Sequence, residues 1–455
     1  MEVRKAEIVI CGAGIMGVSA AYFLAVKTGM DHVVLVDERS PLTLTSDKST
    51  ECYRNWWPGP GDAMVRLMNR SIDLMEKMAQ ECGNLFHLNR RGYLYLSTEK
   101  ARIADLENTA REAESLGAGN LRVHDMSSDS YVGHLADGFA QKLDGADLLL
   151  GPKLIQGYFP YLSKDVVAAL HVRRAGWLSA QQYGMWMLEQ ARAAGVVVIR
   201  GRVEGVDVRA GMVEGVTLGD GTRIKAPVFV NAAGPHLGGL GKLLDVKLPV
   251  HNERHLKSSF DDHLEVLSRD APLVICADPQ RLEWNEAEQA LLVDDEQTTW
   301  LLDELPAGAH ARPEGESGAR SILALWDLRN DAVDVEFPVQ IDPLAAELAV
   351  RGLVRILPGM QAYVRRMPRP FVDGGYYTKT LENRPLVGQA GPEGSYVIGA
   401  ASGYGIMAAA GMADLLTVQI TGKELPGHAA AFAPNRYSND AYVSSLEDWG
   451  DSWQL

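Results

Sequence analysis

Three glycines near the N-terminus, and an aspartate 20 residues after the last of them, form the pattern with the clearest chemistry. The apolar run 8–10 leads into Gly12–Gly17, which reads GAGIMG, and the apolar run 33–36 ends at Asp37. These glycines allow a tight turn, a close approach of backbone to phosphate, and close packing of the following helix on a sheet. The helix N-terminus would attract phosphates, and Asp37 is placed to accept hydrogen bonds from a ribose. The spacing therefore predicts a dinucleotide site.

Composition narrows the class of protein. The chain has 455 residues, of which 46% are hydrophobic and 23% charged, with a net charge of −15. Such a negative chain would be repelled by nucleic acid and by anionic membranes, so neither is expected as a partner. The sequence enters a strand directly, without a signal peptide or an uninterrupted apolar run long enough to span a membrane, so a cytoplasmic location is expected. The four cysteines lack disulfide or metal spacing, and no metal site is predicted.

The elements that must position this site follow in a mixed order along the chain. A polar segment, 43–50, leads to Arg54, and a helix with one apolar face follows. Its methionine-rich stripe predicts core packing, and not a ligand surface. The stripe consists of Met64, Leu67, Met68, Ile72, Met75 and Met78.

Later segments alternate between strands and helices, as expected for an α/β chain. Strands are predicted at 92–97, 196–199 and 227–234, a helix at 183–194, and a hairpin at 213–226 that turns at Asp220-Gly221. The segment Pro306–Gly318, rich in Gly, Pro, Ala and Glu, predicts a surface loop. The last segment, 435–455, carries Trp449 and Trp453 and is expected to pack on the body or on a neighbouring subunit.

Four separated blocks, taken together, resemble the D-amino acid oxidase superfamily of FAD-dependent oxidoreductases, in the branch with sarcosine oxidase, glycine oxidase and dye-linked proline dehydrogenases. The blocks are Gly12–Gly17 with Asp37; Thr45–Arg54; Val203 with Asn231–Gly234; and Tyr377–Gly388 with Gly399–Met407. The late glycine block favours FAD over NAD.

The resemblance implies an α/β fold in which a Rossmann-like FAD-binding domain of the GR2 type is interleaved with an α+β substrate domain on an antiparallel sheet. The FAD-binding domain is expected at 1–88, 152–245 and 373–426, the substrate domain at 89–151 and 246–372, and a C-terminal arm at 427–455.

The resemblance also implies which residues hold FAD. For Ser46, Ser49 and Thr50, helix capping remains the alternative. Noncovalent FAD is expected, because Gly375 stands where covalent members of the family carry a cysteine. The implied FAD-binding residues are Gly12, Gly14, Ile15, Met16, Gly17, Asp37, Glu38, Ser46, Ser49, Thr50, Val203, Ala232, Gly234, Gly403, Tyr404, Gly405, Ile406 and Met407.

A small-molecule amine or amino acid is the implied substrate, from which a hydride leaves the carbon beside nitrogen to give an imine. Arg54 is the first candidate for a carboxylate anchor, with a structural salt bridge as its alternative. Tyr377 is the second candidate, or else a buried tyrosine bonded to a backbone carbonyl. His255 could accept the amine proton or be structural.

The electron acceptor and the reaction type stay open. Met407 replaces a lysine found beside the flavin in sarcosine oxidases, which favours a quinone, dye or partner protein over oxygen as the acceptor. Two alternatives remain: oxidation of a 2-hydroxy acid on the same fold, and a noncatalytic assembly or electron-relay subunit. The sequence leaves the substrate and the oligomeric state open.

Overall fold

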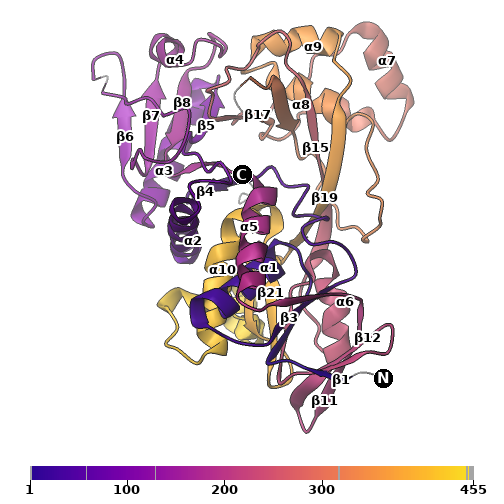
Figure 1. Cartoon of the computed structure of the whole chain (residues 1–455). Helices are drawn as coiled ribbons and strands as arrows, with labels where there is room; N and C mark the ends of the chain where they lie inside the picture. Colours follow the sequence, from indigo (N-terminus) through magenta and orange to yellow (C-terminus); the bar gives the residue numbers. More distant parts are fainter. Residues whose placement is uncertain (1–2, 58, 129, 316–317, 447–448, 450–455) are drawn as a thin grey trace.

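The computed structural model describes residues 3–57, 59–128, 130–315, 318–446 and 449. Two large sheets dominate the molecule. The sheet that carries the N-terminal strands lies in the lower half of Figure 1 with its helices, and most of the other sheet spreads across the upper half.

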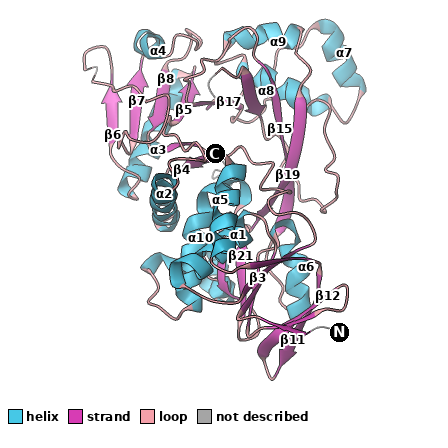
Figure 2. Ribbon diagram, in the orientation of Figure 1, coloured by secondary structure: helices cyan, strands magenta, loops and turns pink. Residues whose placement is uncertain are grey.

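The first sheet has six strands, five of them parallel, with an antiparallel strand at one edge. Its central strands are continuous apolar runs, because both faces are covered. Helices α1 (Ile15–Tyr22), α5 (Ala180–Ala193) and α10 (Gly405–Ile420) pack together beside it (Figure 2). The strands, in order, are β10 (Val197–Arg200), β3 (Val33–Asp37), β2 (Ile8–Cys11), β14 (Val228–Asn231), β21 (Ser395–Gly399) and β20 (Leu386–Gln389).

A four-stranded sheet packs its valines against the first sheet. The predicted hairpin is confirmed, since two of its strands pair antiparallel and Gly221 turns at φ 83°. The strand order is β1 (Val3–Lys5), β13 (Arg223–Lys225), β12 (Met212–Leu218) and β11 (Val203–Arg209). A separate pair joins β4 (Cys52–Arg54) to β9 (Ala175–Trp177).

The second large sheet has nine strands and is mostly antiparallel, with two parallel pairs. Its apolar face is covered by α8 (Ala345–Leu353) and the segments around it. The predicted division into domains stays a prediction. The strand order is β19 (Phe371–Lys379), β15 (His251–Asp261), β18 (Ser321–Leu325), β17 (His310–Glu314), β16 (Leu273–Cys276), β5 (Tyr93–Ser97), β8 (Ala168–Val172), β7 (Ala146–Leu150) and β6 (Leu121–His124).

The prediction of a surface loop over Pro306–Gly318 was wrong for the middle of the segment. Strand β17 lies inside this segment, between two partners in the middle of the sheet, and the side chains of His310 and Arg312 are buried. Glycine and proline at both ends of the segment concealed a short strand that pairs with β18, a few residues further along, and with the more distant β16.

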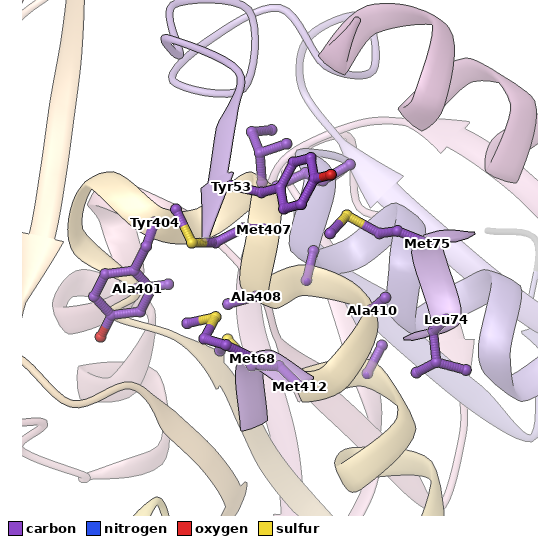
Figure 3. Packing of buried hydrophobic residues seen from close by; sticks show 14 of the residues in the cluster. Tyr53, Met68, Leu74, Met75, Ala401, Tyr404, Met407, Ala408, Ala410 and Met412 are labelled. Atoms are coloured by element: carbon purple, nitrogen blue, oxygen red, sulfur yellow. The ribbon is translucent and has the colours of Figure 1, made fainter. Parts of the chain in front are cut away.

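The predicted methionine stripe is confirmed as core. It lies on α2 (Ala63–Glu81), and all of its members are buried. Figure 3 shows Met68 and Met75 beside Ala408, Ala410 and Met412 of α10. The small residues of α10 let the two helices approach closely, so α2 fixes the direction of α10.

The segment Ser402–Ile420 is, by length and composition, apolar enough to cross a membrane. In the part of the chain that the structure describes, it is the core helix that packs against α1 and α2, and 67% of its most apolar stretch is buried.

The remaining helices are peripheral. They are α3 (Ile103–Ser115), α4 (Pro152–Tyr158), α6 (Leu237–Gly241), α7 (Glu286–Asp294), α9 (Gln361–Arg365) and α11 (Asp440–Ser445).

The C-terminal tail packs on the body at Trp449, because the guanidinium of Arg384 lies over its ring. Trp453 lies outside the described residues.

Truncation of Met75 to alanine should lower the free energy of unfolding by about 2–4 kcal/mol, because it leaves a cavity between α2 and α10. Urea unfolding followed by circular dichroism measures this change. Met185→Ala, on the exposed face of α5, is the control and should change it by less than about 0.5 kcal/mol. Equal losses in both variants would contradict the assigned packing.

Candidate active site

The predicted dinucleotide site lies where the parallel strands of the first sheet end. A cavity of about 750 Å³, the dinucleotide cavity, opens between the turn before α1 and the ends of β14 and β21. Ser46 Oγ accepts a hydrogen bond from Ile15 N at 2.9 Å, and Asp37 Oδ2 accepts one from Ala13 N at 2.7 Å. These two hydrogen bonds hold Ser46 of the polar segment and the carboxylate of Asp37 against the turn at the N-terminus of α1.

The backbone around the turn before α1 leaves no space for a side chain at Gly12 or Gly17. A Cβ on Gly12, where φ is 110°, would collide with the carbonyl of Ala232, and one on Gly17 would collide with the carbonyl of Gly12. A Cβ on Gly14 would lie 3.3 Å from Ser46 Oγ. Such a cradle of backbone at a helix N-terminus fits a pyrophosphate. The residues present therefore fit the dinucleotide that the sequence predicts.

A second and larger space, the inner cavity, lies between the nine-stranded sheet and the N-terminus of α10. Its open volume is about 1240 Å³, and Ser402 lines both cavities, so the two adjoin. A ligand could thus extend from the glycine turn to the N-terminus of α10. The wall of the inner cavity includes Thr50, Arg54, Trp57, Tyr93, His310, Asp327, Tyr377, Gly403, Tyr404 and Met407.

Most of the predicted FAD-binding residues line one of these two cavities. The exceptions are Gly17, which lies beneath the turn, and Glu38, Ser49, Val203 and Ile406. The side chain of Val203 is buried in the core of the four-stranded sheet, and the role predicted for it belongs to its backbone. The individual roles stay predictions.

Arg54 is buried in the wall of the inner cavity and has no carboxylate within ion-pair distance among the described residues. Its Nε donates to the carbonyl of Trp56 at 3.2 Å. The guanidinium carbon lies 4.6 Å from the ring centroid of Trp57 and 5.7 Å from that of Tyr93. The aromatic faces stabilise the buried cation, and the remaining N–H groups are free to bind an anion. The structural salt bridge that the sequence left open is therefore not present in the described part of the chain.

Tyr377 lies between the late glycine segment and His255. A Cβ on Gly403 would approach its ring to 2.6 Å, and the imidazole of His255 stacks on this ring with ring centroids 3.7 Å apart. Burial raises the pKa of the Tyr377 phenol, which stays neutral. Hydrogen bonds between a tyrosine hydroxyl and backbone are made by the neighbouring residue Tyr376. Its hydroxyl accepts from the N–H of Glu336 and donates to the carbonyl of Glu336. The position of Tyr377 thus suits contact with a ligand.

His255 does not line the inner cavity, but a carboxylate lies within ion-pair distance of each ring nitrogen; hydrogen-bond geometry is met at Nε2 and not at Nδ1. Nδ1 lies 2.8 Å from Oδ1 of Asp327, and Nε2 lies 3.2 Å from Oε2 of Glu253. Burial opposes protonation, yet the two carboxylates raise the pKa of His255 above its ordinary value. Glu253 Oε2 also accepts a bond from Lys379 Nζ at 2.5 Å. The imidazole of His255 therefore connects the cavity wall, at Asp327, to the buried ion pair of Glu253 and Lys379.

Sequence reasoning missed Asp327, His310, Glu253 and Lys379. Asp327 follows β18 and His310 begins β17, and each reaches the cavity only through the strand order of the second sheet. Glu253 and His255 are two residues apart on β15, so their side chains face the same side of the strand. This spacing is the one local sign in the sequence that the two belong together.

Neither cysteine beside the site is activated. Burial raises the pKa of Cys11 to about 12, and burial also raises the pKa of Cys52. Both thiols therefore stay protonated and act as small apolar groups.

The site has the features of a dinucleotide-binding oxidoreductase: a glycine turn before a helix, an aspartate placed to bind a ribose, and a cavity at the carboxyl ends of parallel strands. Residues 7–419 match the family described as FAD dependent oxidoreductase, and the chain belongs to that family. FAD is therefore its cofactor.

Comparisons with individual proteins agree with this family. Rat mitochondrial dimethylglycine dehydrogenase is 24% identical over 95% of this chain, which spans only 45% of that relative's length. The crystal structure of L-proline dehydrogenase from P. horikoshii has a TM-score of 0.71 and 19% identity, with 96% of this chain and 99% of the other covered. Glycine oxidase from Geobacillus kaustophilus has a TM-score of 0.71 and 14% identity, with 94% and 98% covered.

Replacement of Gly12 by alanine should weaken FAD binding by about tenfold or more, because the added methyl group displaces the turn from the end of β14. Titration of the apoprotein with FAD, followed by flavin fluorescence, measures the dissociation constant. Gly29→Ala is a matched control, since φ is 71° at that position but nothing lies within 4 Å of the added atom. Equal affinity in the two variants would contradict the assigned phosphate cradle.

Proposed function

We propose that this protein oxidises the C–N bond of an amino acid whose nitrogen is secondary or N-methylated, and that Arg54 binds the substrate carboxylate. The supporting observation is a buried guanidinium that lines the inner cavity and lacks a carboxylate partner in the described chain. A buried cation of this kind favours an anionic ligand. An α-amino acid supplies a carboxylate beside the carbon that loses hydride.

The relatives support an amino acid as the substrate. Two of these relatives are named for dimethylglycine and proline, both of which carry alkyl groups on nitrogen, and the third relative is named for glycine. In this chain, the wall of the inner cavity also includes Leu273, Ile275, Leu325 and Met407, which offer apolar surface to such alkyl groups. This wall favours an N-alkyl substrate over glycine.

FAD, when bound, accepts the hydride. The protein's own part is to hold the substrate: Arg54 fixes the carboxylate, and the ring of Tyr377 beside Gly403 limits where the rest of the substrate lies. The aromatic side chains of Trp57 and Tyr93 add apolar surface to the cavity wall and would help to keep water from a bound substrate. We further propose an acceptor other than oxygen, supported by the apolar side chain of Met407 at the N-terminus of α10.

Anaerobic bleaching of the flavin with a panel of sarcosine, dimethylglycine, proline, glycine and 2-hydroxy acids tests this proposal directly. Bleaching by an N-alkyl amino acid is expected, with slow recovery in air. Bleaching by a hydroxy acid alone would overturn the proposed substrate class. Fast recovery with hydrogen peroxide would overturn the proposed acceptor, and no bleaching in a FAD-loaded protein would favour a noncatalytic role.

The substitution Arg54→Gln should raise the KM for the amino-acid substrate by about a hundredfold, because two charge-assisted hydrogen bonds to the carboxylate are lost. Steady-state kinetics with an artificial electron acceptor measure this change. Arg209→Gln, at an exposed position on β11, is the control and should leave KM unchanged. An unchanged KM in Arg54→Gln would place the carboxylate elsewhere.

A further inference from the structure

Beside the inner cavity, two carboxylates and two cations form a continuous chain. Asp327 lies 2.8 Å from His255, His255 lies 3.2 Å from Glu253, and Glu253 lies 2.5 Å from Lys379. The side chains of His255 and Lys379 are 3% and 2% exposed, so solvent screens their charges little. With all four ionised, this tetrad carries no net charge, although Asp327 lines the cavity.

The pairing pattern supports four ionised groups. Two carboxylates lie within 3.2 Å of the imidazole nitrogens of His255, and opposite charges this close favour the protonated ring. Interactions with His255 also lower the pKa of Asp327 against the effect of burial. Burial lowers the pKa of Lys379, but its ion pair with Glu253 supports its charged form.

Other titratable groups around the tetrad do not change this count. His251 pairs with Glu253 Oε1 at 3.2 Å, but its side chain is 37% exposed and solvent screens it. Burial lowers the pKa of His310, and its Nδ1 lies 2.7 Å from the carbonyl of Gly308, so this ring is neutral near pH 7. The phenol of Tyr377, stacked on His255, is neutral as well.

A second cluster lies behind Thr50 and is also balanced. Arg312 Nη2 lies 3.1 Å from Glu51 and 2.7 Å from Glu314, and Lys257 Nζ donates to the carbonyl of Ser49 nearby at 2.7 Å. Two cations again face two anions. Arg54 is therefore the uncompensated charge that the described residues present to the inner cavity.

We infer that the tetrad of Asp327, His255, Glu253 and Lys379 is a specificity device that leaves one net positive charge in the inner cavity, so the cavity binds a monoanionic amino acid with an uncharged amine. This inference rests on the proposed function and deepens it. An amino acid in water is mainly a zwitterion, whose ammonium group would leave the charge of Arg54 uncompensated. The monoanion neutralises Arg54, and its amine already has the free electron pair that hydride loss requires.

Two ligands of equal shape and fixed charge test the inference without turnover. Glycine betaine is a permanent zwitterion, and tert-butylacetate, the anion of tert-butylacetic acid, replaces its nitrogen with carbon. Neither can gain or lose a proton at the quaternary centre. Isothermal titration calorimetry of the FAD-loaded protein, at about pH 7.5, measures both dissociation constants. We expect the native protein to bind tert-butylacetate at least about tenfold more tightly than betaine.

Charge variants then separate this role from a merely structural one. Asp327→Asn adds net positive charge and should increase the preference for the anion, whereas His255→Gln and Lys379→Met remove a cation and should each reduce or reverse it. Lys379→Met keeps the inference testable where His255→Gln fails to fold. Lys225→Gln, at an exposed position on β13 in the four-stranded sheet, makes the same charge change outside the cavity wall and should leave the preference unaltered.

The outcomes distinguish the inference from the proposed function. Failure of tert-butylacetate to bind, or binding that Arg54→Gln does not weaken, would overturn the proposed carboxylate anchor. Binding through Arg54 with no preference over betaine would overturn the inference alone. A preference that stays the same in both Lys379→Met and Asp327→Asn would also overturn it, because a structural tetrad would weaken both ligands equally.

Discussion

The close approach of the turn at Gly12 to the end of β14 is the constraint on which the other features of the site depend. A single methyl group at Gly12 or Gly17 would push the backbone of this turn away from Ala232 or from itself. The same approach sets α1 against the sheet, and α10 packs on α1. The N-termini of two helices thereby converge on one continuous space, and a negatively charged or electron-rich ligand there gains from both.

The second sheet provides the charged groups, and their arrangement follows from strand alternation. Residues two apart on β15 face the same side, so Glu253, His255 and Lys257 form a row of ionisable groups. Adjacent segments supply the opposite charges: Lys379 on β19 pairs with Glu253, and Asp327, which follows β18, pairs with His255. Removing such charges from water costs several kcal/mol for each ion, and only close pairing offsets this cost. Each buried ion is thus a constraint on how the strands align.

Much of the first sheet and its dinucleotide cavity could be predicted because the signals are local: apolar runs, glycine spacing, and Asp37 at the end of a strand. The helix with the methionine stripe was predictable for the same reason. The second sheet was less accessible, because β17 is short, begins near glycine and proline, and pairs on one side with β16, about 35 residues earlier in the sequence. Asp327 and His310 share the cavity wall only through that pairing, and no local pattern of residues encodes it.

Arg54 connects the stability of the fold with its function. A guanidinium in the protein interior loses most of its hydration, and the contacts with Trp57 and Tyr93 restore only part of that free energy, about 0.5–2 kcal/mol for each ring. The neutral tetrad beside it offers little additional attraction. The ligand-free fold therefore retains an unfavourable electrostatic free energy at this one position, and an anion that enters the cavity relieves it. An anion that binds at Arg54 therefore also raises the free energy of unfolding, because it stabilises the folded state alone.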